Sequence, residues 1–63
     1  MKNNLRVLRA VNNITQLELG KQVGVSAGAI NLIENNKTDC RLSLALKIAK
    51  YFNKPIEEIF ELN

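Results

Sequence analysis

Apolar residues recur along this chain at intervals of three and four positions, the spacing that gathers side chains on one face of a helix. Asn, Ser, Thr and Gly, which favour helix ends, separate the apolar stretches. Runs of β-branched residues that alternate with polar ones, the sign of a half-buried strand, do not occur. The pattern therefore predicts an all-α fold, with little support for a sheet.

Five short helices account for this pattern. With their capping or stopping residues, they are expected at Asn3 or Asn4 to Asn12, Thr15 to Gly24, Ser26 to Asn35, Leu42 to Phe52, and after Pro55. In the fourth helix, the apolar face is expected to consist of Leu42, Ala45, Ile48, Ala49 and Phe52. The fifth is expected to hold Ile56, Ile59 and Phe60. Because only short loops separate these helices, residues 1–63 are predicted to form a single compact domain.

The second and third predicted helices are separated only by Gly24-Val25-Ser26. A three-residue turn that begins with glycine and has an apolar residue second makes its two helices cross steeply. Gly20 lies inside the second helix, where glycine costs about 1 kcal/mol relative to alanine. We therefore expect the third helix to pass close to Gly20, with Ile30 as its neighbour.

Charge is distributed unevenly along the chain. Residues 1–56 contain all nine lysines and arginines against three acids, a net charge of +6, whereas Glu57, Glu58 and Glu61 fall in the last seven positions. A small basic domain favours a polyanionic partner such as DNA, RNA or an anionic membrane surface. A positive face that only keeps the protein soluble is the alternative.

Catalysis and metal binding find little support in the composition. There is no histidine and Cys40 is the only cysteine, which excludes an intrachain disulfide and a Cys/His metal site. The other acids, Glu18, Glu34 and Asp39, are too scattered to assemble a catalytic site. The first residues do not resemble a signal peptide, and no segment approaches the roughly 20 apolar residues of a membrane span. We expect a cytoplasmic protein that is not an enzyme and has no cofactor.

The stretch TQLELGKQVGVSAGAINLIE, residues 15–34, resembles the helix-turn-helix of the Cro and phage-repressor family, also called the Xre class. The segments LRVLR, VGVS, INLIENNK, LALKIAKYF and PIEEIF stand in the family's order and spacing, so the resemblance covers essentially the whole chain. It implies a five-helix, lambda-repressor-like DNA-binding domain, with the helix-turn-helix at about residues 15–35 and double-stranded DNA as the partner.

The resemblance assigns contacts with the DNA backbone to two places. Thr15 and Gln16 stand at the start of the second helix, and Asn35 and Lys37 follow the third. A helix N-terminus presents free N–H groups and partial positive charge to a phosphate, which agrees with the first assignment. Such contacts position a protein on DNA but carry no sequence information.

Four further positions are interpreted beside this resemblance. Arg9 and Glu34 match a pair that links the first helix to the end of the third, a structural role, whereas Arg6 is expected to be simply solvated. Arg41 stands where the family usually has Ser or Thr. The fourth helix is therefore expected to be capped by Asp39 or to be poorly capped.

The predicted reading helix lacks the usual polar side chains. The family positions that face the major groove correspond here to Ala27, Gly28, Ala29 and Asn31, and the polar candidates for base contacts are Ser26, Asn31 and Asn35. Three explanations remain open. Ala27, Ala29 and Leu32 read thymine methyl groups, or DNA shape supplies specificity, or base reading has been weakened. Asn31 is the expected main polar reader.

The carboxy-terminal third has more apolar residues than one buried stripe requires. Residues 51–63 are expected to contribute to a homodimer, and the predicted interface consists of Leu46, Tyr51, Ile59, Phe60 and Leu62. Two-fold dimers of this kind read half-sites about one helical turn apart. Val7, Val11 and Leu17 replace the family's usual polar residues. They are either ordinary exposed apolar residues or a contact with a regulatory protein.

Together these features predict a sequence-specific transcriptional regulator, most simply a dimeric repressor that binds a two-fold-symmetric operator in the major groove. The alternative is a protein-interaction or antitoxin-like module on a helix-turn-helix scaffold whose base reading has been weakened.

Overall fold

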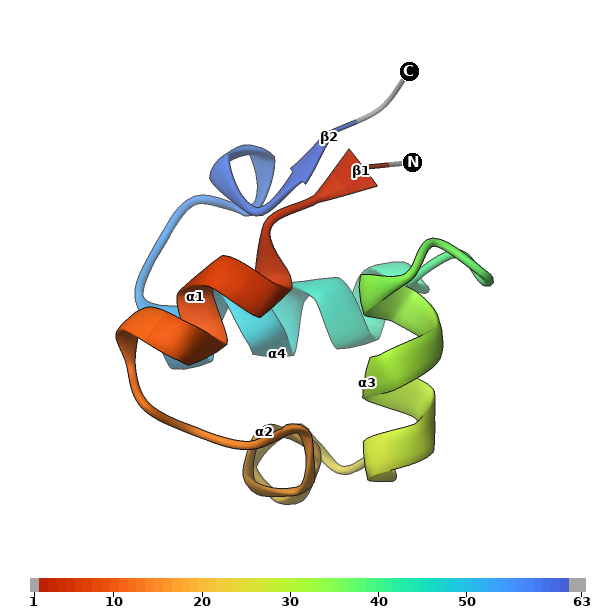
Figure 1. Ribbon diagram of the computed structural model, residues 1–63. Coiled ribbons are helices and arrows are strands. Elements are labelled where there is room, and N and C mark those ends of the chain that lie inside the picture. The colour runs from red at the N-terminus through yellow and green to blue at the C-terminus, as the bar shows by residue number, and fades with distance from the viewer. Residues whose placement is uncertain (1, 62–63) are drawn as a thin grey trace.

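Four α-helices form most of the fold in the computed structural model, which describes residues 2–61 (Figure 1). In chain order the elements are β1 (Lys2–Asn3), α1 (Leu5–Val11), α2 (Gln16–Val23), α3 (Ala27–Glu34), α4 (Leu42–Phe52), the 3-10 turn η1 (Ile56–Glu58) and β2 (Phe60–Glu61). The four α-helices lie where the apolar periodicity predicts them.

Side-chain caps set the starts of α2 and α3. The Thr15 hydroxyl accepts a hydrogen bond from the Glu18 amide at 3.0 Å, and the Glu18 carboxylate accepts one from the Thr15 amide at 3.2 Å. The Ser26 hydroxyl accepts a hydrogen bond from the Ala29 amide at 3.1 Å. Between the two helices, Gly24 ends α2 with a positive φ of 82°, which glycine adopts without strain. The predicted start of each helix is therefore confirmed.

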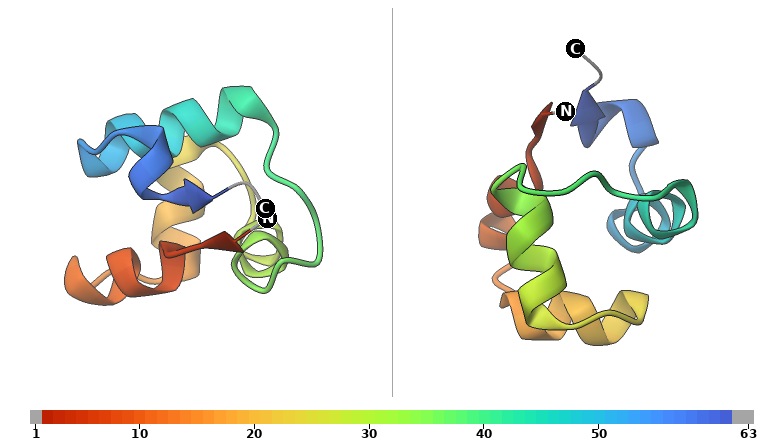
Figure 2. Two further views of the ribbon diagram at one scale, coloured as in Figure 1. Left: turned by 90° about the horizontal axis from the view of Figure 1, so that it is seen from above. Right: turned by 90° about the vertical axis from the view of Figure 1, so that its right-hand side faces the viewer.

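The turn at Gly24 sends α3 across the direction of α2, which is seen end-on in Figure 1. The four helices surround one apolar core, and α4 lies on the opposite side of the domain from α1 and α3 in the right-hand view of Figure 2. The core consists of Leu5, Leu8, Leu19, Val23, Ile30, Ile33, Leu44, Ile48, Ala49 and Ile59. Every helix contributes to it, so packing holds α3 firmly against the rest of the domain.

The close neighbour of Gly20 is the turn and not the third helix as expected. A Cβ atom at Gly20 would overlap the carbonyl oxygen of Val25 and lie 3.3 Å from the carbonyl carbon of Ser26. The atoms nearest to this position thus belong to the Val25-Ser26 turn and not, as expected, to Ile30. The turn itself folds back over Gly20, whose carbonyl accepts hydrogen bonds from the amides of Gly24 and Val25.

The predicted fifth helix is only the single 3-10 turn η1, and the chain then continues as a strand. β2 pairs antiparallel with β1, with Asn3 opposite Phe60 and Lys2 opposite Glu61. Asn4 extends this contact, because its amide donates to the carbonyl of Ile59 at 3.1 Å and its side chain to that of Glu58 at 3.0 Å. The amino-terminal segment thus supplies the hydrogen bonds that a longer helix would have made internally. A strand of two residues is too short to reveal a period of two in the sequence.

The burial of Leu42, Leu44 and Ile59 differs from the prediction. Leu42 is 68% exposed, and Leu44, one turn before Ile48, is buried instead. Ile59 is only 2% exposed, so its assignment to a dimer interface is wrong: the side chain belongs to the core. Leu62, which was also assigned to the interface, lies outside the described residues. α4 begins at Leu42, and its N-cap residue Arg41 makes no side-chain capping hydrogen bond, the second of the two expectations for this helix.

Candidate nucleic-acid interface

The outer face of α3 is open to solvent. Ile30, Ile33 and Glu34 point inward and are buried. On the other side of the helix, the exposed residues are Ser26, Gly28, Asn31 and Leu32. Ala27 and Ala29 are half-buried, so their methyl groups are less accessible than the predicted reading role suggests. The helix therefore presents a smooth surface with few long side chains, on which Leu32 and Asn31 project furthest.

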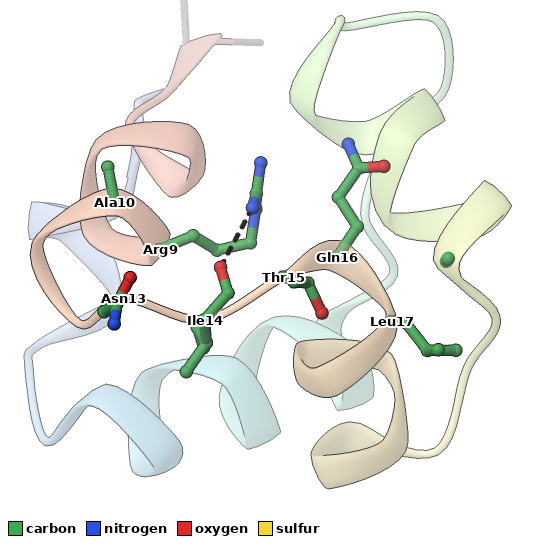
Figure 3. Close-up of a pocket in the computed structure, with 8 residues that line it drawn as sticks. Arg9, Ala10, Asn13, Ile14, Thr15, Gln16 and Leu17 are labelled. Atoms are coloured by element: carbon green, nitrogen blue, oxygen red, sulfur yellow. Dashed lines mark hydrogen bonds between the residues drawn. The ribbon is translucent and has the colours of Figure 1, made fainter.

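The start of α2 borders a surface hollow beside this face. The hollow is lined by Arg9, Ala10, Asn13, Ile14, Thr15, Gln16, Leu17 and Ala27. Figure 3 shows the side chains of Arg9 and Gln16 on the same side of the segment that joins α1 to α2. Because the first N–H groups of a helix have no partner within it, this location suits an anion. The structure thus brings the predicted phosphate residues Thr15 and Gln16 next to the first residue of α3.

Glu34 is a fully buried carboxylate at the end of α3. Both of its oxygens accept hydrogen bonds from Arg9, that from Nη2 to Oε1 measuring 3.0 Å, and Gln16 Nε2 donates to Oε1 at 3.2 Å. Burial alone would raise the pKa of Glu34, but the hydrogen bonds from Arg9 and Gln16, with the charges of Arg9 and Arg6, outweigh it and lower that pKa. The pair is ionised and structural, as the resemblance implied.

Arg9 also joins α1 to the chain segment before α2. Its Nη1 donates to the carbonyl of Ile14 at 3.1 Å, a bond drawn in Figure 3. The hydrogen bond with Glu34 raises the pKa of Arg9 further above its ordinary value, so this guanidinium stays charged. The Arg9 guanidinium thereby fixes the start of α2 and the end of α3 relative to α1.

Arg6 is not simply solvated. Its Nη2 donates to Oδ1 of Asn35 at 2.8 Å, and its Nε lies 3.7 Å from Oε1 of Glu34. Asn35 in turn donates from Nδ2 to the carbonyl of Asn31 at 2.9 Å. The predicted phosphate residue Asn35 is therefore held between α1 and the last turn of α3. The sequence offered no signal for this contact, because Arg6 and Asn35 are 29 positions apart.

The loop after α3 is ordered by hydrogen bonds to its neighbours. Asn36 has a positive φ of 56°, and the amide of Lys37 donates to the carbonyl of Leu32 at 2.9 Å. From the amino-terminal segment, Asn3 Nδ2 donates to the carbonyl of Ile33 at 2.9 Å and to Oδ1 of Asn36 at 3.2 Å. Lys37 itself is exposed at the end of this loop. The loop thus presents Asn35 and Lys37 from the same end of α3.

A second surface lies on α4 and the carboxy-terminal segment. Two of the predicted dimer residues, Leu46 and Tyr51, are exposed, and Phe60 is half-buried. Phe60 also lines an apolar groove with Cys40, Leu42, Ala45, Ile56, Glu57 and Glu61. Leu42 was assigned to the apolar face of the fourth helix and Ile56 only to the predicted fifth helix, so their part in this surface was missed. Burial raises the pKa of the Cys40 thiol, although the nearby charge of Arg41 acts in the opposite direction. The raised pKa keeps the thiol protonated at neutral pH.

Other kinds of site find no geometric support within residues 2–61. This part of the chain holds no cluster of three or more His, Cys, Asp or Glu side chains suited to a metal ion. None of its helices has the length and apolar character needed to cross a membrane.

Comparisons with known proteins agree with this geometry. Residues 5–59 match the helix-turn-helix family. An uncharacterized HTH-type transcriptional regulator of Methanocaldococcus jannaschii is 52% identical over 60 residues, which cover 95% of this chain and 91% of that protein. The uncharacterized HTH-type transcriptional regulator YgzD of Bacillus subtilis is 40% identical over 62 residues, covering 98% and 94%. Among solved structures, the P22 c2 repressor protein in complex with a synthetic operator has a TM-score of 0.84 at 30% identity, over 89% of this chain and 85% of that one.

Proposed function

We propose that this chain, which belongs to the helix-turn-helix family of DNA-binding transcriptional regulators, acts as a dimeric repressor on a two-fold-symmetric operator. The observation that carries the proposal is the open outer face of α3 beside the N-terminus of α2. In this arrangement α3 enters the major groove while α2 meets the DNA backbone. The similar P22 c2 repressor is itself in complex with an operator.

Sequence reading is assigned to the outer face of α3. Asn31 is exposed and carries the amide group that pairs with the edge of adenine. Leu32, with the half-buried methyl groups of Ala27 and Ala29, provides apolar contacts for thymine methyl groups. Gly28 and Ser26 add little bulk, so the backbone of α3 approaches the base edges closely. Specificity then rests on one amide, several methyl contacts and DNA shape.

Backbone contacts flank this face on both sides. Thr15 and Gln16 present the free backbone amides in the first turn of α2 to one phosphate, and the Gln16 side-chain amide, which donates to Glu34, lies beside them. Asn35 and Lys37 stand at the other end of α3. Because phosphate contacts set the register of a protein on DNA, these two groups orient the small reading face.

Dimerisation is assigned to the apolar groove and the adjoining face of α4. A single helix-turn-helix unit buries too little DNA surface for tight binding, which a second copy remedies. The groove residues Leu42, Ile56 and Phe60, with exposed Leu46 and Tyr51 on α4, give an apolar surface that a two-fold-related copy covers with the same residues.

Two measurements test the proposal. Selection of binding sites from a random DNA pool is expected to enrich a motif with two-fold symmetry. Sedimentation is expected to give a dimer at micromolar concentration for the wild type and a monomer for Leu46→Glu, which changes an exposed residue and should leave the fold intact. Val11→Glu, a matched change at another exposed apolar position on α1, should remain dimeric.

A protein-interaction or antitoxin-like module is the second candidate. Val7, Val11 and Leu17 on α1 and α2 are 60%, 76% and 54% exposed, and base reading is assigned to none of them. If the random pool gave no enriched motif, whether DNA binding was sequence-blind or absent, this candidate would be favoured over the repressor.

A further inference from the structure

We propose that Arg6 on α1 is an additional DNA-backbone contact, which joins the phosphate residues at the start of α2 to those at the end of α3. This inference rests on the proposed function, since it requires α3 to lie in the major groove. Nothing in the local pattern of α1 distinguishes Arg6 from an ordinary surface arginine, so the argument depends on its tertiary contacts.

The guanidinium of Arg6 is both anchored and exposed. Its Nη2 donates to Asn35 Oδ1 at 2.8 Å and its Nε lies 3.7 Å from Glu34 Oε1. The side chain is nevertheless 62% exposed. An arginine held in this way has already lost much of the rotamer freedom that a phosphate contact would otherwise cost. A guanidinium has five N–H donors in a planar fork, and the contacts named here engage only part of that fork.

The charge of Arg6 is not needed to neutralise Glu34. Arg9 donates hydrogen bonds to both carboxylate oxygens of Glu34, and Gln16 donates to one of them. Arg9 is largely buried with Glu34, so these two charges cancel within the domain. Arg6 stands outside this pair, and its positive charge faces solvent beside Asn35. Guanidinium groups at such positions bind phosphate oxygens well, because their geometry permits two parallel hydrogen bonds.

The position of Arg6 completes a continuous line of polar side chains. Gln16 contacts Glu34, Arg6 approaches the same carboxylate, and Arg6 contacts Asn35. The line therefore runs from the N-terminus of α2 to the last turn of α3, the two places already assigned to the DNA backbone. α1 lies alongside both places in Figure 2, where the view from the right places it next to α3. Successive phosphates along one DNA strand would meet Gln16, Arg6 and Asn35.

Salt dependence of binding separates this role from a purely structural one. A fluorescently labelled duplex of mixed sequence is titrated with the full chain between 50 and 200 mM salt, using wild type, Arg6→Gln, Arg6→Lys and, as a matched control, Lys50→Gln on the exposed side of α4. Each lost phosphate contact lowers the slope of log affinity against log salt by about 0.9, so the advantage of wild type over Arg6→Gln should shrink about 3.5-fold across this range. Arg6→Lys should keep the wild-type slope, as should Lys50→Gln.

Thermal melting of the same four proteins without DNA completes the test. If Arg6→Gln melts at a lower temperature but keeps the wild-type slope, Arg6 is only a tether for Asn35 and the inference is wrong. An equal loss of slope in Lys50→Gln would also contradict it, because the effect would then report net charge alone. Absence of salt-dependent DNA binding by the wild type would be a different failure, since it overturns the proposed function itself together with this contact.

Discussion

Arg9 and Glu34 form a buried ion pair that connects the first helix to the end of the third, 25 positions later in the chain. Glu34 is completely enclosed, and its carboxylate has no access to water that would replace the guanidinium. A charge buried in this way is costly once its partner is removed. The pair therefore makes the orientation of α3 depend on α1.

Arg9→Ala is expected to lower the free energy of unfolding by about 3–5 kcal/mol, because it leaves the Glu34 carboxylate buried without its main partner. The double variant Arg9→Met with Glu34→Leu removes both charges and should recover most of that stability. Urea denaturation followed by circular dichroism measures both. Arg41→Ala, at an exposed position before α4, is the control and should change stability by less than about 0.5 kcal/mol. A double variant as unstable as Arg9→Ala would contradict this explanation.

Acid is expected to destabilise the fold through Glu34. The pKa of this carboxyl is lower in the folded protein than its ordinary value of 4.5, so the unfolded chain binds the proton more readily. The resulting stability is fully present above pH 4.5 and is lost as the pH falls below it toward the folded pKa. Unfolding free energies measured from pH 6 to pH 3 should fall more steeply for the wild type than for the double variant without this carboxylate. Parallel curves would assign the acid sensitivity to other groups.

Gly20 and Gly28 should respond in opposite directions to alanine. A Cβ at Gly20 meets the backbone carbonyl of Val25, which cannot move without shifting the turn, so Gly20→Ala should cost about 1–3 kcal/mol. At Gly28 the nearest atom is the Ser26 hydroxyl oxygen at 3.8 Å, an ordinary contact. Gly28→Ala should therefore raise stability by about 0.5 kcal/mol through reduced freedom of the unfolded chain. Thermal melting compares the two, and a stable Gly20→Ala protein would argue against the close packing of this turn.

Asn53 ends α4 in a left-handed conformation, with a φ of 55°. Asparagine tolerates this region, whereas alanine is strained there by about 1 kcal/mol, so Asn53→Ala should destabilise the fold by that amount. Asn53→Gly should be neutral or slightly stabilising, since glycine adopts this conformation freely. Chemical denaturation distinguishes the two variants. If they were equally stable, backbone strain would not explain the choice of asparagine here.

Asn31→Ala is expected to relax sequence preference rather than weaken all binding. If its amide reads one base, affinity for the preferred site should fall by about 1–3 kcal/mol, with little change for sites altered at that base pair. Lys37→Ala is the contrasting variant and should weaken every sequence alike, with a salt slope reduced by about 1. Affinities for single-base variants of the selected site give both patterns. If Asn31→Ala lowered the affinity for all sites equally, Asn31 would be a DNA-backbone contact and not a base-reading residue.

Local sequence features were sufficient for the framework of the fold. Thr15, Ser26 and Gly24 define the ends of α2 and α3 by hydrogen bonds and dihedral preferences within a few residues, so a single sequence reveals them. The same holds for the buried stripe of α4 at Ala45, Ile48 and Ala49. The exposed face of α3, to which base reading is assigned by proposal, followed from the helix-turn-helix pattern, because α3 has only one face left after Ile30 and Ile33 are buried.

Contacts between distant segments decided the remainder. Phe60 and Glu61 form a strand because they pair with Lys2 and Asn3, nearly 60 positions away, a match that no local preference encodes. Ile59 belongs to the core for the same reason, since β1 and η1 bring it inward. In the sequence, nothing distinguishes Arg6 from an ordinary surface arginine. Only the position of α1 beside the end of α3 allows its guanidinium to donate a hydrogen bond to Asn35. Periodicity and caps act over a few residues and are visible in a sequence, whereas pairing across the fold depends on where the whole chain brings each group.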